Sequence, residues 1–288
     1  MVLMLLLACA PTGPGEVVIA PDEARDGLDG AEGPYGAAWL PVRVQARVDG
    51  AVDAEVVFPS DASGEPLDGP FPALIFVQGG LVTPERYRWI SAHAATRGYV
   101  GISAQHKGDL AIFEADNGRF ALEGVEAIES GTLAGLLEPG ADAVVTGHSL
   151  GGVVAPILWV DDPRMVGMAI IASYAANSTP VEERTDSLTL SLTGAEDGSA
   201  LREDVEEGWE RLGGQTWLGV VEGMNHFNWT DDATAENLEG DGVATRPEEE
   251  TRRDAMRVFD AWMDASFGDE QALDALNAGE FSGVEWRQ

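Results

Sequence analysis

The segment Gly147-His148-Ser149-Leu150-Gly151 constrains the fold of this chain more than any other stretch. Residues 141–146 before it are apolar and rich in β-branched side chains, which favours a buried strand. The apolar residues 152–160 after it favour a helix, which Pro156 should kink or shorten. A serine at such a sharp turn is strained, and small neighbours leave room for strand and helix to approach. Its hydroxyl then lies clear of the sheet, close to the free N–H groups of the helix start.

Strand and helix patterns alternate along the rest of the chain. Alternating polarity predicts two antiparallel opening strands, and continuous apolar runs predict buried parallel strands. The expected strands are 40–46, 54–58, 73–77, 98–102, 141–146, 166–171, 188–192 and 216–221, and the expected helices are 84–97, 119–137, 152–160, 200–212 and 247–266. This order implies an α/β fold with a mostly parallel central sheet flanked by helices. Residues 172–187 are too few for a large lid, so we expect an open site.

A strand–serine–helix turn within such a series is typical of the nucleophile elbow of the α/β-hydrolase fold. The serine needs a general base, and in this fold an acid and then a histidine follow it along the chain. Of four histidines, only His226 lies downstream of Ser149, in a loop after the last expected strand. His93 and His106 lie upstream, and we expect the side chain of His148 to point away from the base.

The acid is expected in the loop after strand 188–192, which contains Glu196 and Asp197. We favour Asp197 because Gly198 behind it permits a tight turn that directs the carboxylate toward the histidine. Glu196 is the alternative, and Asp186, which precedes the strand, is less favoured. The acid would fix the imidazole tautomer and stabilise the imidazolium ion.

Two backbone N–H groups must face the negative charge that develops during acyl transfer. One is expected from Leu150, directly after the nucleophile. The other is expected from the loop Gln78-Gly79-Gly80-Leu81, where Gly80 is the favoured donor. The alternative is that these glycines only turn the chain.

With these residues placed, the chain resembles the chlorophyllase branch of the α/β-hydrolase superfamily, near the bacterial cutinase-like polyester hydrolases. The resemblance extends over residues 36–268, and the matching segments are 76–82, 87–105, 146–152 and the loops of Asp197 and His226. Gln78 stands where that family usually carries histidine or proline, and Gly80 where it often carries a bulky residue. Leu150 replaces the arginine typical of plant chlorophyllases. These departures argue against chlorophyll as the substrate and leave the acyl pocket undefined.

The chain is strongly acidic, with 50 Asp and Glu against 17 Lys and Arg and a formal net charge of −33. Such a surface repels phosphate backbones, so no nucleic-acid partner is expected. The 288 residues can bury one large core, which we place in a single domain over residues 35–288. No metal or cofactor is implied by the proposed chemistry.

The first ten residues are apolar but far too few to span a bilayer. Leu6-Leu7-Ala8-Cys9 is similar to a bacterial lipobox, so we expect residues 1–9 to be a signal peptide region with Cys9 lipidated. The alternative is a chance cysteine in an apolar leader. Residues 10–34, rich in Gly, Pro and Asp, predict a flexible acidic tether. The expected location is the bacterial cell envelope or the extracellular space, with a lipid anchor in the outer membrane or periplasm.

The sequence therefore predicts a serine hydrolase that cleaves carboxylic esters through an acyl-enzyme, with Ser149, Asp197 and His226 as the triad. The expected partners are a small-molecule or polymeric ester and, through the N-terminal anchor, a membrane. A serine peptidase or thioesterase would use the same triad. A non-catalytic surface lipoprotein that keeps the fold for binding is a further alternative, against which the intact set of three residues argues.

Overall fold

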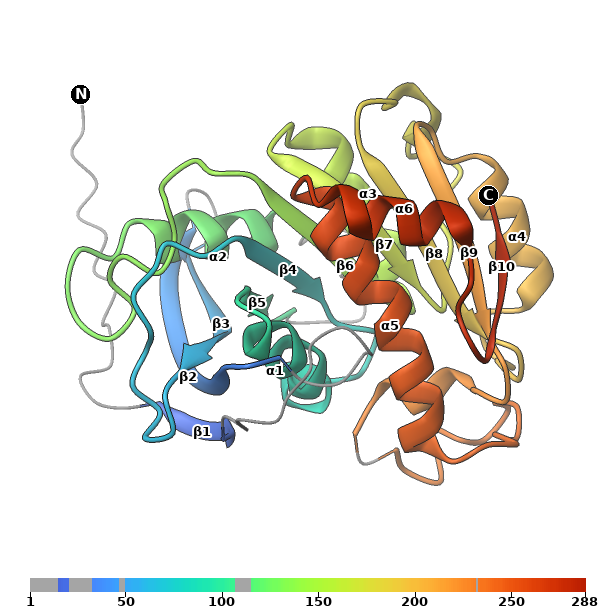
Figure 1. Ribbon diagram of the computed structural model, residues 1–288, viewed down its shortest axis with the longest axis horizontal. Helices are drawn as coiled ribbons and strands as arrows, with labels where there is room; N and C mark the ends of the chain where they lie inside the picture. Colours follow the sequence, from blue (N-terminus) through green and yellow to red (C-terminus); the bar gives the residue numbers. More distant parts are fainter. Residues whose placement is uncertain (1–14, 21–32, 47–49, 107–114, 232) are drawn as a thin grey trace.

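The computed structural model describes residues 15–20, 33–46, 50–106, 115–231 and 233–288, and these form helices around one central sheet (Figure 1). The strands are β1 (Glu16–Ile19), β2 (Gly36–Ala46), β3 (Gly50–Ser60), β4 (Ala73–Val77), β5 (Val100–Ala104), β6 (Ala143–His148), β7 (Met165–Ile171), β8 (Leu188–Gly194), β9 (Gln215–Val221) and β10 (Val284–Arg287). The helices are α1 (Arg88–Thr96), α2 (Asp116–Glu126), α3 (Leu150–Asp161), α4 (Arg202–Glu210), α5 (Glu248–Ser266) and α6 (Glu270–Ala278). The 3-10 turns in the described ranges are η1 (Pro84–Tyr87), η3 (Val181–Glu183) and η4 (His226–Trp229).

The described strands form a sheet in the order β1-β2-β3-β5-β4-β6-β7-β8-β9-β10. Strands β5, β4, β6, β7, β8 and β9 are parallel, whereas β1, β2, β3 and β10 pair antiparallel with their neighbours. The mostly parallel sheet expected from the sequence is therefore confirmed. Because parallel strands end at one edge, the loops that follow them meet there, and in open α/β sheets that edge carries the site.

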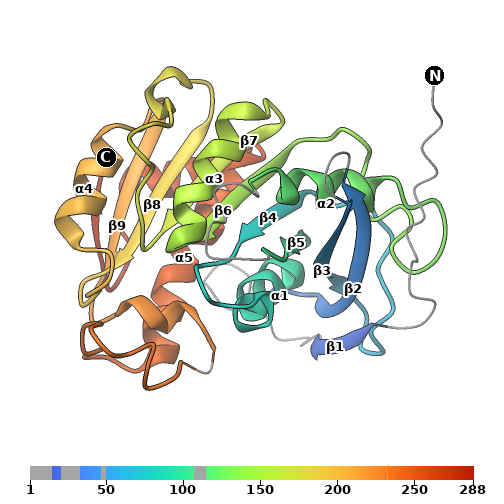
Figure 2. The same ribbon diagram turned by 180° about the vertical axis from the view of Figure 1, so that it is seen from behind.

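Two hydrophobic cores cover the two faces of the sheet. Leu74 and Phe76 of β4 pack into the core that contains α1 and α5, whereas Ile75 packs into the core that contains α2 and α3. Strand side chains alternate between faces, so a continuous apolar run fills both cores. Helix α5 lies in front of the sheet in Figure 1, and α3 lies in front in the view from behind (Figure 2).

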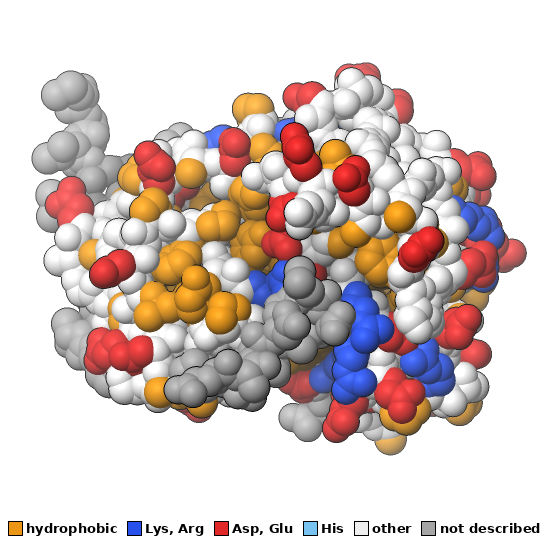
Figure 3. Space-filling view, in the orientation of Figure 1, with side chains coloured by type: hydrophobic (Ala, Val, Ile, Leu, Met, Phe, Trp, Pro, Cys, Tyr) orange, Lys and Arg blue, Asp and Glu red, His pale blue; other side chains and the backbone are white. Residues whose placement is uncertain are grey.

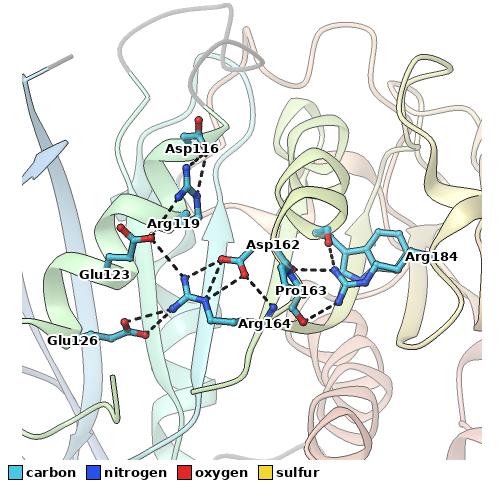
Figure 4. Close-up of polar contacts among 9 residues, drawn as sticks. Asp116, Arg119, Glu123, Glu126, Asp162, Pro163, Arg164 and Arg184 are labelled. Atoms are coloured by element: carbon cyan, nitrogen blue, oxygen red, sulfur yellow. Dashed lines mark hydrogen bonds and ion pairs between the residues drawn. The ribbon is translucent and has the colours of Figure 1, made fainter. Parts of the chain in front are cut away.

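Two arginines form hydrogen bonds and ion pairs between helices and strands at the edge of the sheet where the parallel strands begin (Figure 4). Arg184 donates to the main-chain carbonyls of Trp159, Asp162, Pro163 and Met165, between the last turn of α3 and the start of β7. A cation there satisfies carbonyls that the helix itself leaves unpaired. Arg164 pairs with Asp162 at 2.9 Å and with Glu126 of α2 at 3.3 Å. The charged cluster therefore lies at the edge away from the serine turn.

Some elements differ from the sequence-based expectation. The helix expected over 119–137 covers Asp116–Glu126 instead. Further along, Gly131 and Gly135 adopt φ of 90° and 76°, which a helix does not allow. Helix α3 continues through Pro156 for 12 residues, so the expected shortening is wrong. Burial of Val154, Leu158 and Trp159 against the sheet outweighs the hydrogen bond that the proline cannot donate.

The two ends of the described chain add strands that the sequence pattern did not predict. Glu16–Ile19 lies within the range expected to be a flexible tether, yet it forms β1 and pairs with β2. Trp39 strengthens this edge by donating from Nε1 to Oε2 of Glu16 at 3.1 Å. At the other edge, β10 pairs with β9 after helix α6. Residues 1–9 with Cys9, and 21–32 of the expected tether, lie outside the described residues.

Between β7 and β8, residues 172–187 form loops and the short turn η3. This agrees with the expectation that no large lid is inserted in that part of the chain. A longer connection, residues 230–247, lies between η4 and α5. None of the helices in the described ranges is long and apolar enough to cross a membrane.

Candidate active site

Ser149 lies at the tight turn between β6 and α3, as the sequence predicts. Its φ of 54° and ψ of −122° place it in a region that side-chain-bearing residues rarely adopt. A Cβ atom on Gly147 would lie 2.1 Å from the carbonyl oxygen of Gly151, and one on Gly151 would lie 2.1 Å from that of Val77. Both glycines are therefore required for the strand, the turn and the helix to pack this closely.

The loops after β8 and β9 bring Asp197 and His226 together. His226 Nδ1 lies 3.1 Å from Oδ1 and 3.0 Å from Oδ2 of Asp197, and both side chains are almost fully buried. The carboxylate also accepts backbone N–H groups of Ser199 at 2.9 Å and Ala200 at 2.7 Å. Because a carboxylate only accepts, this geometry holds the proton of the neutral imidazole on Nδ1 and leaves Nε2 free as a base.

The other candidate acids lie elsewhere. Glu196 directs Oε1 toward the hydroxyl of Thr245, at 3.3 Å. Asp186 is exposed and pairs with Arg184 at 3.3 Å, near the opposite edge of the sheet. Asp197 is thus the candidate acid that contacts the histidine.

The two residues expected to supply the oxyanion hole are neighbours in space. A Cβ atom on Gly80 would lie 3.2 Å from Cδ2 of Leu150, so the loop after β4 lies against the start of α3. The N–H of Gly79, the preceding residue of this loop, donates to the Tyr87 hydroxyl at 3.2 Å and is therefore already engaged. This arrangement favours the N–H groups of Gly80 and Leu150 as the pair that would face an oxyanion.

Comparison with models of protein families matches residues 73–253 to the alpha/beta hydrolase family, more than half of the chain. The chain belongs to the alpha/beta hydrolase family. The matched range runs from β4 into α5 and contains Ser149, Asp197 and His226. A comparison with curated proteins finds no match. Membership confirms the predicted fold class and supports a hydrolytic activity, whereas the chlorophyllase or cutinase-like branch stays a prediction.

In this alpha/beta hydrolase, His148 does not point away from the candidate base as expected. Its ring lies 4.6 Å from that of His226, centroid to centroid, and its Nε2 is 3.1 Å from the His226 carbonyl oxygen. Val144 of the same strand packs into the core with α1 and α5, and the side chain of His148 shares that face because strand residues alternate. The core there also contains Met224 and Trp229, which flank His226, so His148 lies beneath the histidine loop.

Asp241, in the connection between η4 and α5, was not predicted as a site residue from the sequence. Its carboxylate accepts the N–H of Gly198 at 2.9 Å in the acid loop, and those of His226 at 3.3 Å and Phe227 at 3.2 Å in the histidine loop. One side chain therefore joins the two loops of this hydrolase. Nothing in its local sequence distinguishes Asp241 from the other acidic residues, because its partners lie far away along the chain.

Gly198 has a different role from the one expected. It does not adopt the left-handed conformation, so its position does not depend on the turn geometry that only glycine favours. Instead, a Cβ atom on Gly198 would lie 2.5 Å from the backbone nitrogen of Gly242. The glycine is needed because the segment that carries Asp241 passes directly against it.

Asn225 and Asn228 fix the turn that carries His226. The Asn225 side chain accepts the N–H of Asn228 at 3.0 Å, and the Asn228 side chain accepts the N–H of Asn225 at 2.9 Å. This reciprocal pair is a capping box built from two amides. The Asn-x-x-Asn spacing around His226 is visible in the sequence and is a signal from which this turn could be predicted. Over the described ranges, no group of three or more His, Cys, Asp or Glu side chains is arranged to hold a metal ion.

Proposed function

We propose that this protein is a serine hydrolase that cleaves carboxylic esters through an acyl-enzyme intermediate. The observation that carries the proposal is the buried contact between His226 and Asp197, in a family member whose Ser149 occupies the strained turn. A buried histidine–carboxylate pair with this geometry is the usual means of activating a serine hydroxyl.

In the proposed reaction, Ser149 Oγ attacks the ester carbonyl while His226 Nε2 accepts the hydroxyl proton. Asp197 keeps the imidazole oriented and stabilises the imidazolium ion. The N–H groups of Leu150 and Gly80 bind the oxyanion, and collapse of the intermediate releases the alcohol with the proton from His226. Water then attacks the acyl-enzyme by the same route, which frees the acid and restores the serine.

Exposed apolar side chains support an ester with an apolar acyl or alcohol part. Leu81 after β4, Tyr174 after β7 and Leu201 after β8 are all exposed, and Leu81 retains 84% of its accessible surface. These residues follow strands whose carboxyl ends lie at the edge that carries Ser149. The net charge of −33 further disfavours anionic substrates. We therefore propose a small or polymeric uncharged ester as the substrate.

A panel of p-nitrophenyl esters with increasing acyl length tests this proposal. Wild-type protein should hydrolyse at least one ester, and Ser149→Ala should lower kcat by about 10³-fold or more because the nucleophile is lost. Ser63→Ala, an exposed turn serine on another part of the chain, is the matched control and should retain full activity. A folded Ser149→Ala variant with near-normal turnover would contradict the proposal. Selective cleavage of peptides or thioesters would assign the protein as a peptidase or thioesterase instead.

We also propose that Cys9 is lipidated and anchors the domain to a membrane. The basis is the segment Leu6-Leu7-Ala8-Cys9 alone. The acidic domain would then lie in the cell envelope or outside the cell, where polymeric or small esters reach it without entry into the cytoplasm.

A further inference from the structure

A chain of hydrogen bonds runs beneath the candidate active site from the oxyanion loop to the histidine loop. The N–H of Gly79 lies 3.2 Å from the Tyr87 hydroxyl, and that hydroxyl lies 2.9 Å from Nδ1 of His148. Nε2 of His148 lies 3.1 Å from the His226 carbonyl oxygen. Tyr87 and His148 are buried, at 0% and 1% exposure, so water does not substitute for these contacts.

The chemistry of the groups allows one direction for this chain. A carbonyl oxygen only accepts, so Nε2 of His148 must carry a proton and donate to His226. In the neutral ring Nδ1 is then an acceptor, and the Tyr87 hydroxyl must donate to it. The hydroxyl oxygen keeps its lone pairs for the N–H of Gly79. Every polar group in the chain is satisfied in this one arrangement, which is what a buried network requires.

The surroundings keep the His148 ring neutral. Burial lowers the pKa of His148 well below its usual value, and the nearby His226 lowers it further. Burial also raises the pKa of Tyr87, so its hydroxyl remains a donor. The titratable and charged groups that face the His148 ring are Tyr87, His226 and Arg86, with Asp197 on the His226 ring itself. A second positive charge there would oppose the imidazolium ion that His226 forms during catalysis.

We propose that Tyr87 and His148 are positioning residues that hold the base loop and the oxyanion loop at a fixed geometry around Ser149. The inference rests on the proposed function for its catalytic consequence. His148 directly precedes the nucleophile, so a fixed His148 ring joins the serine turn to the His226 backbone and, through Tyr87, to Gly79. Neither side chain accepts or delivers a proton of the reaction in this scheme; both act by holding the residues that do.

Tyr87→Phe tests the catalytic consequence. Removal of the hydroxyl leaves Nδ1 of His148 and the N–H of Gly79 without their partner, so kcat should fall about 10-fold or more, while KM stays within about twofold. Tyr99→Phe is the matched control, because Tyr99 is also buried and its hydroxyl donates to Asp264 away from the site. Tyr99→Phe should keep wild-type kcat. Wild-type kcat in Tyr87→Phe would overturn the positioning role.

Nitrogen-15 NMR of the histidine rings tests the network independently of activity. The His148 resonances are assigned by their loss in His148→Gln, and the wild-type ring should be the neutral Nε2–H tautomer even at about pH 6, where an ordinary histidine is largely charged. Tyr87→Phe should change the tautomer or the protonation of the His148 ring, because Nδ1 loses its donor. An Nδ1–H tautomer or a charged His148 ring in the wild type would overturn the inference whether or not the protein hydrolyses esters. If the expected tautomer is present but no ester is hydrolysed, the proposed function is contradicted and the hydrogen-bond network is not.

Discussion

Ser149 holds a backbone conformation that costs an L-residue about 1–3 kcal/mol. Among the described residues, Leu81, Ser149 and Ala172 are the side-chain-bearing residues with positive φ, at 59°, 54° and 48°. They follow β4, β6 and β7 and so lie at the same edge of the sheet. Strain concentrated there supports the placement of the site, because such conformations persist only where the surrounding structure fixes them.

The choice of acid is a prediction at the scale of one residue. Asp197→Asn should lower kcat about 10³-fold or more, because an amide no longer favours the imidazole tautomer that frees Nε2. Glu196→Gln, the neighbouring matched control, should have a mild effect because its side chain contacts Thr245. Steady-state kinetics of both variants decides the assignment. A reversal of the two effects would assign the acid to Glu196.

At the scale of elements, the geometry depends on contacts between loops that are distant in sequence. Asp241 accepts N–H groups from the acid loop and from the histidine loop, and the segment beside it lies against Gly198. The loops are therefore not positioned by their strands alone. The candidate acid and base are held in contact by a third segment, which belongs to neither loop.

Asp241→Asn tests this contribution of the third segment. The amide keeps one acceptor but loses the other and the charge, so we expect kcat to fall about 10-fold through misplacement of His226 and stability to fall by about 1–3 kcal/mol. Kinetics and thermal unfolding measure the two effects. Glu239→Gln removes the same charge from an exposed position in the same connection and serves as the control. Equal behaviour of the two variants would show that Asp241 does not hold the loops.

The strands from β2 to β9, most helices and the strained turn were predictable because their patterns are local. Apolar runs and glycine spacing are sufficient to predict β4, β6 and α3. The order of the motifs along the chain is sufficient to predict Asp197 and His226 as the candidate acid and base. Gly131 and Gly135 keep residues 131–137 out of a helix through positive φ angles that the sequence does not reveal. The hydrogen bonds of Asp241, and those of the His148 ring with Tyr87 and His226, join segments that are distant along the chain. Local patterns do not encode such contacts.

At the scale of the whole molecule, charge is the dominant property of the surface. Acidic side chains are spread over the face shown in Figure 3, and basic side chains gather over the amino-terminal half of α5. The net charge of −33 keeps the domain soluble and repels it from anionic lipid surfaces. If a lipid anchor is present, the domain should therefore be held near a membrane without lying on it.

Cys9→Ser tests the proposed anchor. A lipid-modified cysteine with two or more acyl chains binds membranes stably, so the wild-type protein should enter the detergent phase on phase separation. Cys9→Ser should move to the aqueous phase with its activity intact, because the proposed triad lies far along the chain. Equal aqueous partition of the two proteins would contradict lipidation of Cys9.

The most direct measurement of the central proposal is the site at which a fluorophosphonate labels the protein. The proposal predicts one covalent adduct per chain, mapped by peptide mass spectrometry to Ser149, with loss of ester hydrolysis in proportion to labelling. Ser149→Ala and His226→Ala should both fail to label, the first for lack of a nucleophile and the second for lack of its base. An adduct on another residue, or ester hydrolysis that persists after Ser149 is fully labelled, would contradict the account.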